Sequence, residues 1–290
     1  MMRFTSMLTL LMIWGCATEL NITLPYEGKQ LVLYCILSPD KVASAQIDRT
    51  YPPTGDVLYE PPIKTAVIEI LENDKVVETL KYTSGNAYES PRRFRPVAGR
   101  SYKIRASASG FPTVESDAET IPLSPQIVGS SVEKTNNNRI SVEIKDYPNQ
   151  TNQYSIQIAG TYEGKQVAIN VLNLSRPDAI SDNCGFRGNL NSFYYRDVCF
   201  DGTTLKTSYN SNLFGTVQVP DLNGRYISKN PDQIQIIVRN VSATYFNYYK
   251  FYPPEDIELA FKQPSSRLYN LKGGYGLFAV YNEKVVVYLN

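Results

Sequence analysis

Histidine is absent from the 290 residues of this sequence, and cysteine occurs only four times. Without histidine, Ser-His-Asp and Cys-His triads, histidine-ligated zinc and imidazole acid–base catalysis are excluded. The cysteines show no C-x-x-C spacing, and no D-x-[DN]-x-[DN]-G calcium loop occurs. A carboxylate pair at glycosidase spacing remains open among 28 acidic residues, but no pattern singles one out. We therefore expect a protein that acts by binding, and we assign no catalytic residue, metal ligand or cofactor.

Excess charge of either sign is also lacking, because 29 basic residues are balanced by 28 acidic ones. This balance argues against nucleic acid as a partner, since phosphate backbones are bound through clustered positive charge. Long apolar runs are missing as well, and none reaches the roughly 20 residues that cross a bilayer as a helix. Hydrophobic residues still make up 42% of the chain, with 22 tyrosines, so the protein can bury substantial cores.

The N-terminus has the layout of a secretory signal, with Arg3 before an apolar run at 7–14. The motif "IWGC" that ends this run resembles the bacterial lipobox, which has an aliphatic residue three before a cysteine and a small residue directly before it. The resemblance implies cleavage after Gly15 and lipid attachment to Cys16, with enough acyl chains for stable anchoring. A plain signal peptide with an incidental cysteine is the alternative.

Short apolar runs between turn signals predict a mainly β protein. In the first half we expect a core strand within 29–38, a hairpin turning at Asn73-Asp74 within 65–82, and an alternating strand within 99–111. In the second half we expect strands on both sides of an Asn-rich turn in 130–146, strands at 152–162 and 232–242, and a closing hairpin at 276–290.

Two prolines in the polar stretch 119–127 predict a domain boundary. The expected organisation is a lipoprotein signal peptide at 1–15, an N-terminal β-sandwich domain at 16–122 and a C-terminal β-rich domain at 123–290. The predicted fold class is mainly β, with two β-sandwich-like (Ig-like) domains and one short aromatic helix near the C-terminus.

The segment "VSATYFNYYKFYPPED" (241–256) is the helical candidate. Ser242 can cap its N-terminus, and Pro253 ends it. Its tyrosines recur at spacings of three and four residues, at Tyr245, Tyr248, Tyr249 and Tyr252. Such a stripe is typical of a short helix packed on a sheet, and the alternative is a platform on which sugars stack.

The three cysteines beyond the anchor predict one disulfide. Cys184 and Cys199 flank a Gly- and Asn-rich stretch with few strand signals, and disulfides form in the cell envelope. Two free thiols are the alternative. Cys35 lies inside an apolar strand and is interpreted as a small buried hydrophobe.

Two further segments admit two interpretations each. The stretch 91–100 gathers four arginines: Arg92, Arg93, Arg95 and Arg100. They form either an anion-binding patch, whose partner would be lipopolysaccharide phosphates or an acidic loop of a receptor, or an ordinary solvated loop. The run "KGGYG" (272–276) looks like a phosphate loop, but the β-patterned "LFAVY" that follows favours a bulge or tight bend.

Two longer stretches carry a family resemblance. Residues 96–122 hold a proline, a Gly-x-x-Tyr strand, a second glycine and a terminal T-x-P, and residues 268–282 hold an aromatic-N-x-x-G-G-x-G-x-F run. Both are similar to a large Bacteroidetes lipoprotein family, domain of unknown function 4249. In this family the closing run is a structural motif, here Asn270, Gly273, Gly274, Gly276 and Phe278. The family has no established activity, so the resemblance supplies no catalytic residues.

The resemblance implies a predominantly β lipoprotein of the outer membrane, held on its periplasmic face or at the cell surface by the lipid on Cys16. Family members often accompany TonB-dependent receptors. We therefore expect an accessory protein that binds a neighbouring TonB-dependent receptor or its cargo. A surface lipoprotein that binds or cleaves glycans is the alternative.

Overall fold

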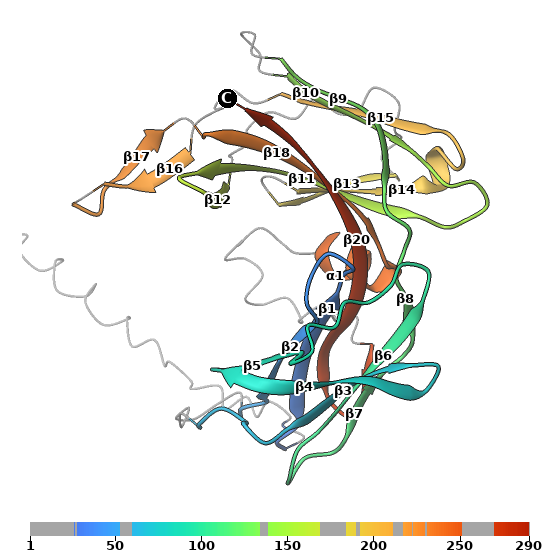
Figure 1. Ribbon diagram of the computed structural model, residues 1–290, viewed down its shortest axis with the longest axis vertical. Helices are drawn as coiled ribbons and strands as arrows, with labels where there is room; N and C mark the ends of the chain where they lie inside the picture. The colour runs from blue at the N-terminus through green and yellow to red at the C-terminus, as the bar shows by residue number, and fades with distance from the viewer. Residues whose placement is uncertain are drawn as a thin grey trace, which may run out of the picture.

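The structure, a computed structural model, describes residues 26, 28–52, 60–133, 139–168, 184–189, 192–210, 217–221, 223–229, 231–250 and 270–289 (Figure 1). Its fold is mainly β, with one α-helix near the C-terminus, which confirms this part of the prediction. The first half contains β1 (Leu31–Leu37), β2 (Ser44–Arg49), β3 (Val67–Glu72), β4 (Lys75–Ser84), β5 (Ala87–Glu89), β6 (Ser101–Ser107), β7 (Val114–Ser116) and β8 (Glu119–Thr120). The second half contains β9 (Gln126–Glu133), β10 (Arg139–Lys145), β11 (Gln153–Tyr162), β12 (Lys165–Ala168), β13 (Gly185–Asn189), β14 (Ser192–Arg196), the 3-10 turn η1 (Asp197–Cys199), β15 (Thr204–Asn210), β16 (Val217–Pro220), β17 (Tyr226–Lys229), β18 (Gln233–Val241), α1 (Ala243–Lys250), β19 (Leu271–Lys272) and β20 (Tyr275–Leu289).

The strands of the first half form one sheet that folds over around an apolar core. Its order is β20-β1-β2-β5-β4-β3-β6-β7-β19. The sheet changes direction at β4, which pairs with β3 over its first part and with β5 over its last part. Burial alternates along β1 and β6, as the sequence pattern predicts, and Leu33, Tyr102 and Ile104 point into the core with at most 1% exposure.

The hairpin between β3 and β4 turns where the sequence predicts it. Asn73 and Asp74 both adopt positive φ, at 51° and 60°. A two-residue turn of this kind matches the twist of the strands it joins, and asparagine and aspartate tolerate it better than most residues. The local sequence therefore sets this turn.

Two sheets face each other in the second half, drawn in the upper part of Figure 1. The three-stranded sheet β15-β10-β9 packs against the part of the large sheet that runs β13-β14-β11-β18-β20. The core between them contains Ile140, Val142 and Ile144 from one sheet, and Ile156, Ile158, Ile234 and Ile236 from the other. The predicted strands around the Asn-rich turn are present, whereas residues 134–138 of the turn lie outside the described residues.

Strand β20 runs through both halves of the molecule and is visible in dark red in Figure 1. Its first part pairs in parallel with β1, from Val32↔Tyr275 to Leu37↔Val280, and its second part pairs antiparallel with β18. The predicted closing hairpin at 276–290 is therefore wrong. The polar residues in its middle do not turn, because Asn282 donates to the Pro122 carbonyl at 3.0 Å and Glu283 pairs with Arg239 at 2.9 Å.

Because β20 belongs to both halves, 15 strands from both halves join into one large mixed sheet, and the molecule does not divide clearly into two Ig-like domains. Leu271, Phe278 and Val280, close to the C-terminus, lie in the core of the first half. The predicted linker segment is also tied to the second half, since the Leu123 carbonyl accepts a hydrogen bond from Asn240 at 3.2 Å. The domain limits at 122 and 123 stay a prediction.

Helix α1 begins where the sequence predicts. The Ser242 hydroxyl accepts a hydrogen bond from the Tyr245 backbone N–H at 3.3 Å, which is the contact of an N-cap. Phe246 is fully buried, and Tyr245 is 8% exposed. The interpretation of the tyrosine stripe as a helix face packed on a sheet is thus confirmed for Tyr245, whereas Tyr252 lies outside the described residues.

Candidate functional site

A pocket of about 350 Å³ opens where the first half of the chain meets the second. Strand β1 and the turn after it supply one wall, and β11, β14, β18, α1 and β20 supply the rest. The lining consists of one aliphatic residue, four tyrosines, two cations and two neutral polar residues: Ile36, Lys41, Gln157, Ser192, Tyr194, Arg239, Tyr245, Tyr249 and Tyr281. None of these lining residues is acidic.

Two cations share one aromatic ring in this pocket. The Lys41 ammonium and the Arg239 guanidinium each lie 5.5 Å from the ring centroid of Tyr281, within cation–π range. Arg239 is fixed further by Glu283, at 2.9 Å, and by the Gln157 amide oxygen, at 3.0 Å. The guanidinium is thus held on three sides, and its charge is balanced by one carboxylate.

Lys41 differs from Arg239 in its surroundings. Its side chain is exposed, and no ion pair of Lys41 occurs within the described part of the chain. The ammonium group can therefore contact a ligand without breaking an internal pair.

The tyrosines of the pocket are held by one another. The hydroxyls of Tyr249 and Tyr34 contact each other, which links α1 to β1. The Tyr249 ring also lies 4.5 Å from the Tyr245 centroid and 5.0 Å from the Tyr248 centroid. Tyr194 contacts Phe246 edge-on, with centroids 6.0 Å apart. Such mutual packing fixes the rings in place and leaves few alternative rotamers.

The phenol groups of Tyr34, Tyr245 and Tyr249 stay protonated at neutral pH. Burial raises the pKa of Tyr34 to about 12, and burial also raises the pKa values of Tyr245 and Tyr249. For Tyr245 the nearby Arg239 guanidinium opposes this rise without cancelling it. The Tyr245 and Tyr249 hydroxyls therefore serve as neutral hydrogen-bond donors and acceptors, and the positive charge of the lining comes from Lys41 and Arg239.

Sequence reasoning found only part of this site. Tyr245 and Tyr249 belong to the predicted stripe, but Lys41, Arg239 and Tyr281 were not singled out. They lie far apart in the chain and share no motif or spacing, so no local signal marks them. Strand pairing brings them together, because β20 passes from β1 to β18 between Val280 and Tyr281.

The C-terminal motif has a structural role. The Asn270 amide accepts from the Phe278 N–H at 3.0 Å and donates to the Phe278 carbonyl at 2.6 Å. A Cβ on Gly273 or Gly276 would overlap the carbonyl oxygen of Thr113 or Leu33, and one on Gly274 would lie 2.6 Å from the Leu31 oxygen. The glycines therefore permit close backbone approach, and the run leads into a strand, unlike a phosphate loop.

This motif and the middle segment 96–122 fall inside a single family match. The sequence profile described as "Domain of unknown function (DUF4249)" matches residues 17–285, nearly the whole chain. The chain belongs to the DUF4249 family. No curated protein matches this DUF4249 chain.

Among solved structures, the DUF4249 chain is similar to a DUF4785 family protein from Legionella pneumophila subsp. pneumophila str. Philadelphia 1. The identity is 9% and the TM-score is 0.24, with 72% of this chain and 52% of the other covered. The DUF4249 chain thus spans about half the length of that protein, and a likeness this weak supports no functional argument.

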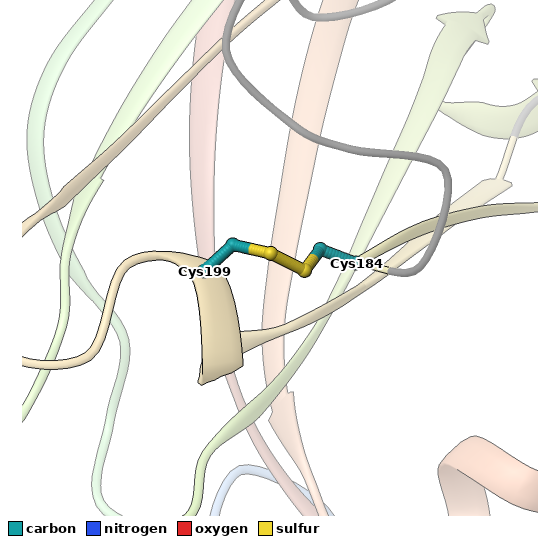
Figure 2. The surroundings of a disulfide bond; sticks show 2 residues. All are labelled: Cys184 and Cys199. Atoms are coloured by element: carbon teal, nitrogen blue, oxygen red, sulfur yellow. A yellow bond between two sulfur atoms is a disulfide. The ribbon is translucent and has the colours of Figure 1, made fainter.

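The predicted disulfide of the DUF4249 chain is present. Figure 2 shows the bridge from Cys184, just before β13, to Cys199 in the η1 turn, and their Cα atoms lie 6.2 Å apart. Cys35 is a free cysteine with 1% exposure, as predicted, and burial raises the pKa of its thiol. A buried thiol of this kind is unreactive.

All four arginines of 91–100 are exposed, and two of them pair with carboxylates. Arg92 pairs with Glu78 at 2.9 Å, and Arg100 pairs with Glu72 at 3.2 Å. Arg95 donates to the Asp40 carbonyl, and Arg93 adopts a φ of 56° in the turn. Two of the four charges thus have carboxylate partners, which weakens any shared attraction for an anion. Binding of an anion by this segment stays a prediction.

The predicted lipid site of the DUF4249 chain, Gly15 and Cys16, lies outside the described residues. No helix in the described ranges is long and apolar enough to cross a membrane. Among the same residues, no group of three or more cysteine, aspartate or glutamate side chains could hold a metal ion.

Proposed function

We propose that this protein is a lipid-anchored accessory protein of the bacterial outer membrane, that it acts by binding, and that its pocket holds the cargo of a neighbouring TonB-dependent receptor. The pocket between β1, α1, β18 and β20 carries this proposal. Its volume, about 350 Å³, lies at the lower end of the range of small-molecule sites, and aromatic side chains with a few fixed polar groups are typical of such sites.

The composition of the lining supports binding over catalysis. Hydrolysis of a glycan or ester without histidine would require a carboxylate, lysine or tyrosine with a strongly shifted pKa beside the substrate. No carboxylate lines the pocket, and burial raises the pKa values of Tyr245 and Tyr249, which keeps these two phenols from acting as bases at neutral pH. The cations and hydroxyls of this lining can orient a ligand, and no carboxylate in it can act as a general base.

Attachment through Cys16 supports a partner in the same membrane. A lipid anchor confines the protein to a surface, where a weak contact gains from high effective concentration. We further propose that the two halves are variants of Ig-like β-sandwiches that share β20.

Crosslinking in intact cells tests this function. After purification through a C-terminal tag, a TonB-dependent receptor should be enriched over other abundant outer-membrane proteins. The matched control is Cys16→Ala, which should abolish incorporation of labelled palmitate, release the protein from membranes and remove the crosslink. Retained labelling in Cys16→Ala would refute the anchor, and receptor recovery no greater than that of other outer-membrane proteins would refute the partner.

Glycan binding at the cell surface is the second candidate. The observation that favours it is Tyr249, a half-buried ring at the pocket wall beside neutral polar groups, because sugars stack on such rings. Glycan cleavage has no support from this pocket, since its lining lacks the two carboxylates that glycoside hydrolysis requires. Turnover of a glycan by the purified protein, lost on substitution of one Asp or Glu without unfolding, would contradict binding alone.

A further inference from the structure

From the charges and rings of the pocket we infer that its ligand is an acidic sugar, with a carboxylate held by Lys41 and a ring stacked on Tyr249. The inference rests on the proposed binding function, because it concerns the same pocket and names the class of ligand. Three features of the lining point to this ligand: its charge, its available ring and its neutral polar groups.

The charge of the lining selects an anion. Lys41 and Arg239 are the two charged residues among those that form it. Arg239 is balanced by Glu283, with side-chain exposures of 13% and 15%, so it is nearly buried within an existing pair. Lys41 is exposed and has no ion pair within the described residues. One positive charge thus remains uncompensated at the pocket, and a carboxylate is its natural partner.

The ring available for stacking is that of Tyr249. The other three tyrosines of the lining are buried, with exposures of 5%, 8% and 5% for Tyr194, Tyr245 and Tyr281. Tyr249 is half-buried and is fixed by its contacts with Tyr34 and Tyr245. A rigid ring loses little conformational entropy when a ligand binds on it, which favours affinity.

The neutral polar groups favour hydroxyl-bearing ligands over purely aromatic ones. Gln157 and Ser192 lie in the wall, and the Gln157 oxygen is oriented by Arg239. The protonated phenols add donors and acceptors. A sugar carries several hydroxyls that can contact such groups at the same time, whereas an aromatic acid offers only its carboxylate.

Titration calorimetry with the purified full-length protein tests this inference. The probes are a short oligogalacturonate and the neutral galactose oligomer of the same length. We expect the acidic probe to bind more tightly, and its affinity to fall with added salt, because the contact with Lys41 is exposed to solvent. Equal affinity for the two probes, or no binding of either, would overturn the inference.

Variants at Lys41 separate charge from packing. Lys41→Gln should weaken binding of the acidic probe about tenfold and leave the neutral probe unchanged, since a hydrogen bond to a charged group is lost. Lys64→Gln is the matched control, because Lys64 lies 5.8 Å from the Tyr82 ring, outside the pocket, and should change neither affinity. An unchanged affinity of Lys41→Gln for the acidic probe would overturn the inference.

Variants at Tyr249 test the ring. Tyr249→Ala should weaken both probes about tenfold, whereas Tyr249→Phe, which keeps the ring and loses only the hydroxyl, should bind both nearly as well as the wild type. Circular dichroism melting shows whether each variant is folded. If Tyr249→Ala stays folded and binds unchanged, the site lies elsewhere and the inference fails. Receptor enrichment in the crosslinking experiment is read separately, so a failure of charge selection leaves the proposed function standing.

Discussion

The side-chain amide of Asn270 makes two hydrogen bonds with the backbone of Phe278, accepting from its N–H at 3.0 Å and donating to its carbonyl at 2.6 Å. The Asn270 side chain thus makes the two backbone hydrogen bonds to Phe278, in β20, that a residue of a neighbouring strand would otherwise make. The same amide nitrogen lies 3.5 Å from the Glu119 carboxylate, so the motif also contacts the end of the first half. These two hydrogen bonds explain why an asparagine precedes the glycines of the C-terminal motif, because an amide side chain can donate and accept at the same time.

Replacing Asn270 should destabilise the fold. Asn270→Asp keeps the size but loses the N–H donor, which leaves the Phe278 carbonyl without this partner and places a second carboxylate near Glu119. We expect the free energy of unfolding to fall by about 2 kcal/mol, measured by urea denaturation. Asn223→Ala, in an exposed turn, is the control and should change it by no more than about 0.5 kcal/mol. Equal losses of unfolding free energy in the two variants would contradict a stabilising role for the hydrogen bonds between Asn270 and Phe278.

Gly276 should tolerate no side chain. Its φ is 122°, and a Cβ would overlap the Leu33 carbonyl oxygen in the neighbouring strand β1. Gly276→Ala should lower the free energy of unfolding by about 3 kcal/mol or more, because backbone strain and overpacking add. Gly85→Ala is the matched control, since Gly85 has a φ of 54° and open space around it. It should cost only about 1 kcal/mol in the same denaturation assay, and a similar cost for both would refute the close approach.

The disulfide should stabilise the second half. Replacing both Cys184 and Cys199 with serine opens a loop with a sequence separation of 15 and should cost about 3 kcal/mol in the chain-entropy model. Peptide mapping without reductant should recover the two cysteines as one linked species. The linked species should persist in Cys35→Ala, because that thiol takes no part in it. Recovery of two separately alkylated peptides from the wild type would exclude the bridge.

Ionisation of the Glu119 carboxyl should lower the stability of the fold as the pH rises. Burial raises the pKa of this carboxyl above the ordinary value of a glutamate, although hydrogen bonds with Thr244, Ser242 and Asn270 lower it in part. The folded state therefore holds its proton to higher pH than the unfolded state. The stabilisation is fully present below the unfolded pKa and is lost as pH rises through the folded pKa.

Glu119→Gln should remove this contribution. It should flatten the pH dependence of the melting temperature above pH 4.5 and raise stability near neutral pH, because the neutral amide oxygen can still accept from Thr244. Glu89→Gln, at an exposed position, should leave the profile as in the wild type. A Glu119→Gln profile that keeps the wild-type slope would show that another group causes it.

Local patterns in the sequence determined the strands and their turns. Alternating burial in β6, the turn at Asn73 and Asp74 and the cap at Ser242 each depend on residues within a few positions of one another. Their physical causes, side-chain periodicity and backbone dihedral preference, act over the same short range. The pairing of Cys184 with Cys199 was also within reach, because so few cysteines leave little choice.

The tertiary structure decided what β20 does and what the pocket contains. The polar residues Asn282 and Glu283 look like a turn in isolation, yet Pro122 and Arg239 satisfy them within a continuous strand. The approach of Lys41 and Arg239 to one ring follows from the parallel pairing of β20 with β1 and its antiparallel pairing with β18. Such pairing reflects the summed hydrogen bonds and buried surface of whole strands far apart in the chain. No single residue specifies this pairing, because the free energy that stabilises it comes from many residues of the assembled sheet together.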